Sequence, residues 1–137
     1  MKQSNNVVVG SINNVDGHDN KITGNQNVVG GEKNSVSGNQ NTIAGGTNTV
    51  TGNINNILGT KNTVSGDQNL IKGDLNKVKG DVNTVSGSDN RVVGNKTVIQ
   101  GSTNTVSGNE NSIIGNQNTV NGSKNSLQGS TNTVSGN

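Results

Sequence analysis

The stretch NTVSGDQNLIKGDL, residues 62–75, contains two consecutive copies of a seven-residue unit, Asn-x-(Val/Ile/Leu)-x-Gly-x-x. The same unit runs from Asn6 to Gly136 in nineteen copies, without insertion or deletion. Every copy has its Gly and its aliphatic residue, and every copy but one has its Asn, which Thr97 replaces. Such regular repetition predicts a repeat architecture in which each unit packs on its neighbours.

The period of seven suggests a coiled coil, but the residues of the unit exclude one. A coiled coil needs two apolar positions per heptad and residues that favour helices. This unit has one dependable apolar position, and its Gly costs a helix about 1 kcal/mol relative to Ala. The unit is instead typical of a short β-strand and a turn. Alternation places Asn and Val on one face and both x residues on the other, Gly permits positive φ at the corner, and turn-forming residues follow.

A single strand of this kind cannot bury its aliphatic side chain, whereas two that face each other can. Two units make one 14-residue coil, and coils stacked about 4.7 Å apart pair every strand in parallel. We therefore predict an all-β fold, a parallel β-solenoid with two strands per 14-residue coil and about nine and a half coils. It should form one domain over residues 1–137, with the repeats in 6–137. The inward Asn side chains should form ladders that bond to the backbone and to the next coil.

The composition excludes several classes of function. The chain has 137 residues, a net charge of +2, no Cys, 24% hydrophobic residues and 0% aromatic residues. It therefore offers no thiolate metal site, no apolar run long enough to span a membrane and no aromatic ring to stack on a base. We expect no nucleic-acid partner, no membrane partner and no cofactor.

Catalytic and metal sites also lack support in the sequence. His18 is the single histidine and lies at a turn position, and thin stacked coils offer no deep pocket. Asp67 and Asp81 should be neighbours in adjacent coils, where a weak calcium site is conceivable. The lysines nearby favour a solvated mixture of charges instead, so we predict no metal site and no enzyme.

The recurring Asn-Thr-Val-Ser-Gly, at residues 62–66, 83–87, 104–108 and 132–136, resembles the repeat of grass ice recrystallisation inhibition proteins, a class of antifreeze protein. The resemblance covers nearly the whole chain. It implies a left-handed β-roll with two flat sheets, one of which binds ice, and a secreted protein of cold tolerance, although the chain starts without a secretory signal segment. The strict period of seven and a lysine-rich middle differ from the grass repeats. The heads of trimeric bacterial adhesins, also left-handed rolls with 14-residue coils, are similar more distantly.

Alternate units lie on opposite sheets, so the outward x residues form two faces of different composition. Ser or Thr fills 12 of 20 outward positions on the first face but only 5 of 18 on the second, beside residues such as Asp16, Leu58 and Lys72. The hydroxyl residues of the first face are the candidate ice-binding residues: Thr23, Ser35, Ser37, Thr49, Thr51, Thr63, Ser65, Thr105, Ser107, Thr119, Thr133 and Ser135. Spacings of about 6.7 Å along a strand and about 4.7 Å between strands approximate the repeats of water positions on ice planes.

We predict an antifreeze protein that adsorbs to ice through this flat Thr/Ser face, inhibits ice recrystallisation and acts as a monomer. Lys77, Lys79, Arg91 and Val93 interrupt the array and leave two smaller patches. We therefore expect modest activity, better at blocking the coarsening of ice crystals than at lowering the freezing point.

Two other functions stay open at the level of sequence. One is a structural or adhesive β-roll, which would form a trimer like the adhesin heads. The other is a self-assembling filament module, because both ends of a roll expose unpaired strands. Asn95 and Asn121 lie in glycosylation sequons, which we expect to be unmodified because an Asn-rich chain produces such sequons by chance.

Overall fold

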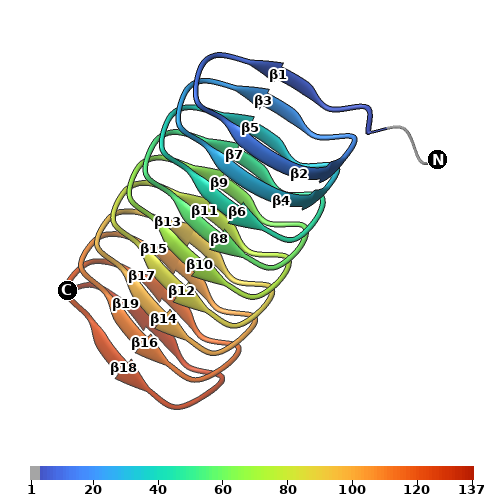
Figure 1. Ribbon diagram of the computed structural model, residues 1–137. Helices are drawn as coiled ribbons and strands as arrows, with labels where there is room; N and C mark the ends of the chain where they lie inside the picture. Colours follow the sequence, from blue (N-terminus) through green and yellow to red (C-terminus); the bar gives the residue numbers. More distant parts are fainter. Residues whose placement is uncertain (1–3) are drawn as a thin grey trace.

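A computed structural model describes residues 4–137, which form nineteen short β-strands joined by turns and no helix (Figure 1). Ten strands make one sheet, in the order β1 (Val7–Val9), β3 (Lys21–Thr23), β5 (Ser35–Ser37), β7 (Thr49–Thr51), β9 (Thr63–Ser65), β11 (Lys77–Lys79), β13 (Arg91–Val93), β15 (Thr105–Ser107), β17 (Thr119–Asn121) and β19 (Thr133–Ser135). Nine strands make the other, in the order β2 (Asn14–His18), β4 (Val28–Glu32), β6 (Thr42–Ala44), β8 (Asn56–Leu58), β10 (Leu70–Lys72), β12 (Thr84–Ser86), β14 (Val98–Gln100), β16 (Ser112–Ile114) and β18 (Ser126–Gln128).

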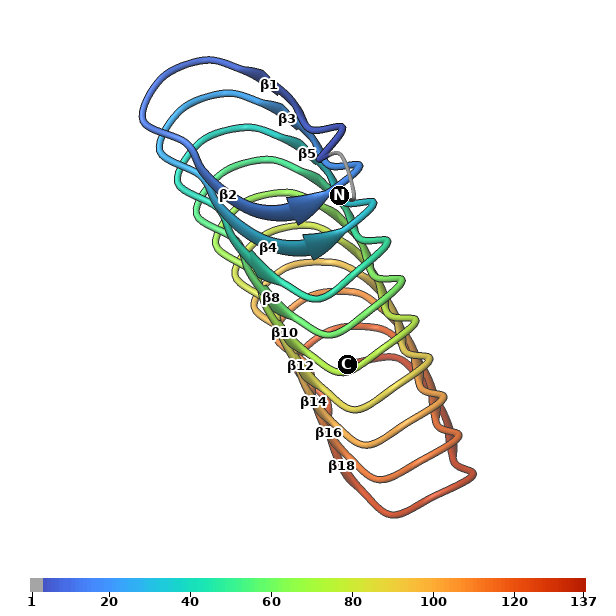
Figure 2. The same ribbon diagram turned by 45° about the vertical axis from the view of Figure 1, so that its right-hand side comes forward.

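The strands pair in parallel with the strand one coil away, and the pairing never slips. Val64 lies beside Val78, and Ile57 lies beside Ile71, each 14 residues along the chain. The two sheets form opposite walls of a rod in which coil follows coil from one end to the other (Figure 2). The predicted parallel β-solenoid, with two strands per 14-residue coil, is confirmed.

The core is a double file of aliphatic side chains, one from each strand, enclosed between the two sheets. The buried members are at most 2% exposed: Ile22, Val29, Val36, Ile43, Val50, Ile57, Val64, Ile71, Val78, Val85, Val92, Ile99, Val106, Ile113 and Val120. Each contributes roughly 1.5–3 kcal/mol relative to an exposed side chain. Since the core has no second layer, polar interactions must supply more of the order than in a thicker protein.

Buried Asn side chains supply these interactions, as the sequence predicted. Asn62 is 0% exposed. Its Nδ2 donates to Gly73 O at 2.8 Å and to Asn48 Oδ1 at 3.1 Å, while its backbone N donates to the same Oδ1 at 2.9 Å. The bonds repeat along the rod and form what we call the inner ladder. Each inner-ladder Asn closes a corner of its own coil and also ties the coil to its predecessor.

Thr97 interrupts the inner ladder. Its backbone N still donates to Asn83 Oδ1 at 3.0 Å, but its hydroxyl reaches Gly108 O only at 3.4 Å. Threonine has no amide oxygen to accept from the next coil. Within residues 4–137, the usual bonds from Asn111 to the preceding coil are therefore missing, although Asn111 Nδ2 still donates to Gly122 O at 2.8 Å.

A second set of side-chain bonds, which the sequence did not predict, runs along the outside of the turns. Asp67 Oδ1 accepts the backbone N–H of Asn53 at 2.6 Å, and Asp81 Oδ1 accepts that of Asp67 at 2.8 Å. Asn and Ser fill equivalent positions in other coils, as where Ser102 Oγ accepts from Ser88 N at 3.2 Å. We call this set the outer ladder. It gives Asp67 and Asp81 a structural role, since each carboxylate satisfies a backbone donor.

The turns impose two unusual backbone conformations in every coil. Gly66 has φ of +135°, and a Cβ there would lie 2.1 Å from Gly80 O in the next coil, so only glycine fits. From Ile12 onward, the residue before each inner-ladder position is left-handed although it is not glycine, as in Gln68 and Ile54, both with φ of 58°. The bond from Gln68 N to Asn53 O, 2.9 Å long, holds this conformation in place.

Candidate functional site

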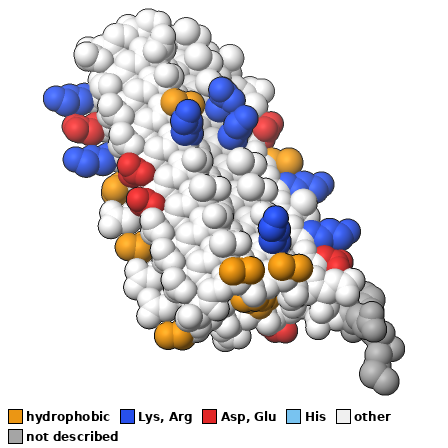
Figure 3. Space-filling model, turned by 90° about the horizontal axis from the view of Figure 1, so that it is seen from above, with side chains coloured by type: hydrophobic (Ala, Val, Ile, Leu, Met, Phe, Trp, Pro, Cys, Tyr) orange, Lys and Arg blue, Asp and Glu red, His pale blue; other side chains and the backbone are white. Residues whose placement is uncertain are grey.

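All twelve hydroxyl residues selected from the sequence lie on the ten-stranded sheet and are exposed. They belong to two columns that run along the rod, one from the first and one from the third residue of each strand. Together, the outward residues of this sheet make up what we call the hydroxyl face. Figure 3 shows the molecule from the side of this sheet, where two wide areas without charged or apolar side chains flank a central group of basic ones.

The hydroxyl residues fall into two groups on this face. The N-terminal patch comprises those of β5, β7 and β9, with Ser35 beside Thr49 and Thr49 beside Thr63; Thr23 extends it onto β3. The C-terminal patch comprises those of β15, β17 and β19, listed above, together with Asn121 in the third-residue column. Parallel pairing without slippage keeps the hydroxyls of adjacent coils directly side by side, except where Asn121 stands between Ser107 and Ser135.

Two strands separate the patches. On β11 and β13 the outward residues are Lys77 beside Arg91 and Lys79 beside Val93, and all four are exposed. The interruption therefore lies where the sequence placed it. Because β11 and β13 pair normally with β9 and β15, both patches belong to one continuous sheet and share one orientation.

The backbone beneath the hydroxyl face is tightly held. Thr49 and Thr51 flank Val50, which is 1% exposed, and the backbone N of Thr49 donates to Asn62 O at 2.9 Å. On the other side of Thr51, Gly52 N donates to the carbonyl O of Ser37, which pairs with Thr51 in the preceding coil, at 2.9 Å. Since the β-branch of threonine also restricts χ1, little side-chain or backbone freedom remains to be lost on binding.

The nine-stranded sheet presents a different outward surface. Its exposed aliphatic side chains include Leu58 at 54%, Val28 at 47%, Ile114 at 46% and Val98 at 39%. Its five hydroxyl residues are Thr42, Thr84, Ser86, Ser112 and Ser126, of which only the last pair stands on adjacent strands in one column. The two faces of the rod therefore differ in arrangement as well as composition.

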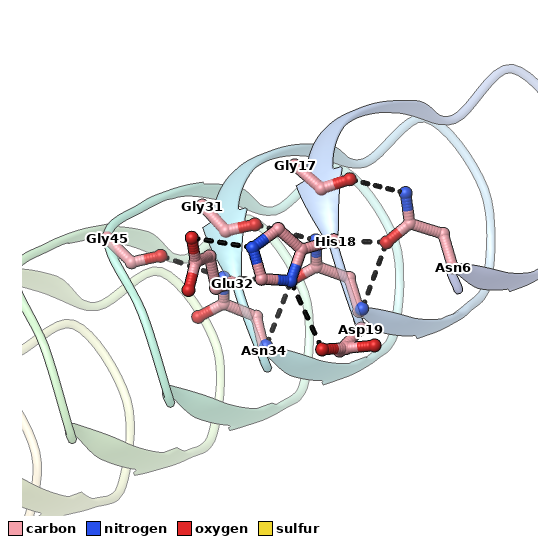
Figure 4. Close-up of polar contacts among 9 residues, drawn as sticks. Asn6, Gly17, His18, Asp19, Gly31, Glu32, Asn34 and Gly45 are labelled. Carbon is pink, nitrogen blue, oxygen red and sulfur yellow. Dashed lines mark hydrogen bonds and ion pairs between the residues drawn. The ribbon is translucent and has the colours of Figure 1, made fainter. Parts of the chain in front are cut away.

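His18 lies closer to charged groups than its isolated place in the sequence suggests. It ends β2, with Nδ1 3.1 Å from Asp19 Oδ2 and Nε2 2.7 Å from Glu32 Oε1, at ion-pair distance (Figure 4). The hydrogen bond from His18 is the main reason why the pKa of the Asp19 carboxyl lies below its ordinary value. The group is a surface charge network at one end of the rod.

Nothing in residues 4–137 adds a second kind of site to the two faces. No pocket forms in this part of the chain, and no three metal-ligating side chains gather there. The described residues also contain no helix that could span a membrane.

A comparison with protein families identifies the family of this chain. A family model described as a grass antifreeze beta roll matches residues 1–73 and, again, residues 59–137, so the two matches overlap and together cover the chain. No curated protein matches this chain.

Proposed function

The chain belongs to the grass antifreeze β-roll family, and on that premise we propose that it binds ice through the hydroxyl face and inhibits ice recrystallisation. In this proposal the protein is non-enzymatic, works outside the cell and acts as a monomer. The family is a non-enzymatic kind of protein, which supports the first point. The proposal rests on one observation above all: hydroxyl residues stand in register in both columns on three adjacent strands of the ten-stranded sheet, whereas the other sheet has only the neighbouring pair Ser112 and Ser126.

The spacing of the hydroxyl face supports ice as the ligand. Neighbouring hydroxyls of a column are about 4.7 Å apart, and the two columns are about 6.7 Å apart, as strand geometry requires. The methyl group of threonine orders adjacent water while its hydroxyl bonds to it. Each contact is weak, so affinity has to come from many contacts made together by a surface that loses little freedom.

The division of the face sets the expected strength of the activity. Each patch spans only three adjacent strands, and Thr23 adds one residue to the first. We therefore propose stronger inhibition of crystal coarsening than depression of the freezing point. Coarsening is slow, and a small number of adsorbed molecules is enough to pin a crystal boundary.

The proposal is tested by a recrystallisation assay on the wild type and two double variants. Thr49→Lys with Thr105→Lys places a long charged side chain in each patch. Thr42→Lys with Thr84→Lys makes the same chemical change on the nine-stranded sheet. In frozen sucrose held just below melting, the wild type and the second variant should keep crystals small, and the first should allow growth close to that without protein. Equal inhibition by both variants would exclude the hydroxyl face as the site.

The adhesive and filament alternatives make different predictions about size. Sedimentation should give one monomer mass at all protein concentrations if the proposal holds. A trimer would favour the adhesive function, and growth of particles with concentration would favour the filament.

A further inference from the structure

A group of basic side chains stands in the middle of the hydroxyl face, and ice binding gives it no role. It consists of Lys77, Lys79 and Arg91, which we call the basic cluster. Lys77 and Arg91 are direct neighbours on β11 and β13, and Lys79 lies two residues along β11 on the same side of the sheet. Figure 3 shows basic side chains gathered on this face, with uncharged surface beyond them toward both ends of the rod and acidic side chains at the edges of the face.

The charge of the basic cluster is not balanced on its own face. The twenty outward positions of the ten-stranded sheet include these three residues and Lys21 as cations, and no Asp or Glu. Among residues 4–137 the only ion pairs involve His18, so no acid lies within ion-pair distance of the cluster. The nearest acids in sequence, Asp81 and Asp89, belong to the turns, where Asp81 Oδ1 already accepts the N–H of Asp67.

We propose that the basic cluster, with the hydroxyls beside it, binds an acidic polysaccharide, a linear chain of sugars that carry carboxylates. The proposal goes beyond ice binding and does not depend on it. Three convergent cations on an open sheet complement a chain of carboxylates, and the absence of a pocket favours an extended ligand over a small one.

The flanking residues favour a sugar polymer over other polyanions. Thr63 and Ser65 adjoin the cluster on β9, and Thr105 and Ser107 adjoin it on β15, so hydroxyls that can bond to sugar hydroxyls lie on both sides. A single-stranded nucleic acid would require aromatic rings on which its bases could stack, and the chain has 0% aromatic residues. A lipid surface would be favoured by apolar side chains around the cations, and beside these three stands only Val93.

The test compares two triple variants that remove the same charge. Lys77→Thr, Lys79→Ser and Arg91→Thr remove the cluster with residues that the face already uses. Lys61→Gln, Lys72→Ser and Lys124→Gln remove three exposed cations from the turns and the nine-stranded sheet. Gln suits the two turn positions, since Gln68 adopts the same left-handed conformation. Thermal unfolding followed by circular dichroism verifies that both variants fold.

Binding is measured by affinity electrophoresis through gels containing polygalacturonate, with dextran as the neutral sugar polymer. The wild type and the control triple should be retarded by polygalacturonate at low salt and not by dextran. The cluster triple should bind roughly tenfold more weakly, as expected for the loss of three exposed charge contacts, and its binding should depend less on salt. Ice recrystallisation inhibition, measured in parallel, should survive in the cluster triple, so that this proposal and ice binding can fail separately.

Several results would overturn the proposal. One is no retardation of the wild type by polygalacturonate, and another is equal weakening in the two triples, which would show that net charge alone is responsible. A third is tighter, cluster-dependent binding to single-stranded DNA or to phosphatidylserine vesicles, which would assign the cluster to a different kind of polyanion.

Discussion

Asparagine and glycine residues at single positions hold neighbouring coils together, a role that a thicker hydrophobic core has in other folds. Asn62 forms three hydrogen bonds with groups of its own and the preceding coil while fully buried. Gly66 lies so close to Gly80 of the next coil that a Cβ at position 66 would overlap with Gly80 O. Because both residues act through contacts between coils, changes at such positions should alter stability sharply.

Thr97→Asn is expected to stabilise the protein. The new amide would donate to Gly108 O and supply the oxygen that Asn111 lacks, as its equivalents do elsewhere along the inner ladder. Two or three restored bonds should raise the free energy of unfolding by roughly 1–3 kcal/mol in chemical denaturation. Thr42→Asn, an exposed change of the same chemistry, should be nearly neutral. If Thr97→Asn leaves the free energy of unfolding unchanged, the role given to the inner ladder is contradicted.

Gly66→Ala is expected to destabilise the protein by at least about 2–3 kcal/mol, because it adds backbone strain to a contact with Gly80 O. Gly30→Ala is the matched control. Gly30 lies outside the repeat's glycine position, and the nearest atom to its Cβ would be 4.0 Å away. The melting temperature of Gly66→Ala should therefore lie clearly below that of Gly30→Ala. Similar values would mean that the coils can move apart at little cost.

The charge network at His18 gives a small pH effect of known sign. Since the pKa of Asp19 is lowered in the folded protein, its contribution to stability is complete above the ordinary value of 3.8 and is lost as the pH falls through the folded value. An NMR titration should place the Asp19 carboxyl below 3.8, and His18→Asn should move it upward. An unchanged midpoint in the variant would remove His18 as the cause.

At the scale of strands and turns, the sequence predicted the elements better than the bonds between them. The Asn-x-Val-x-Gly alternation predicted each strand, its inward residues and the inner ladder, because one local pattern repeats. The outer ladder was missed, since its Asn, Asp and Ser also suit ordinary turns and their partners lie fourteen residues away. The left-handed turn residues were missed because Gln, Lys, Ile and Val occupy the position without a common property.

The arrangement of the candidate site was likewise predicted only in part. The twelve hydroxyl residues could be assigned to one face because alternation and parity of the repeat fix which way each side chain points. The surroundings of His18 were overlooked, although the 14-residue coil places residue 18 beside residue 32 just as it places Asp67 beside Asp81, and the pairing of β2 with β4 has this register. The repeat does not fix the side-chain rotamers that bring His18 Nε2 to 2.7 Å from Glu32 Oε1.

Joining the two patches should increase activity. Lys77→Thr, Lys79→Ser, Arg91→Thr and Val93→Ser would extend both hydroxyl columns across β11 and β13. More contacts made by one rigid surface should lower the protein concentration needed to stop recrystallisation several-fold. The control, Asn14→Thr, Asp16→Ser, Leu58→Ser and Gln128→Ser, adds four hydroxyls to the nine-stranded sheet without placing any of them beside a hydroxyl on an adjacent strand, and it should have no such effect. An equal gain from both would mean that added hydroxyls act without regard to face.

The whole molecule is a rod in which each coil contacts only the coils beside it. Stability in such a molecule is a sum of coil and interface terms, so a local defect such as Thr97 weakens one junction and leaves the others intact. The same stacking aligns ten strands in one sheet and gives the hydroxyl face its length. A rigid surface of this extent is what adsorption to a crystal requires.

Partition into slowly growing ice tests the role of the hydroxyl face most directly, because it measures adsorption itself. A fluorescently labelled wild type and the Thr42→Lys, Thr84→Lys variant should be enriched in the ice fraction. The Thr49→Lys, Thr105→Lys variant should remain in the liquid with ordinary solutes. Enrichment of that variant to the level of the wild type, or exclusion of the wild type from ice, would contradict the account.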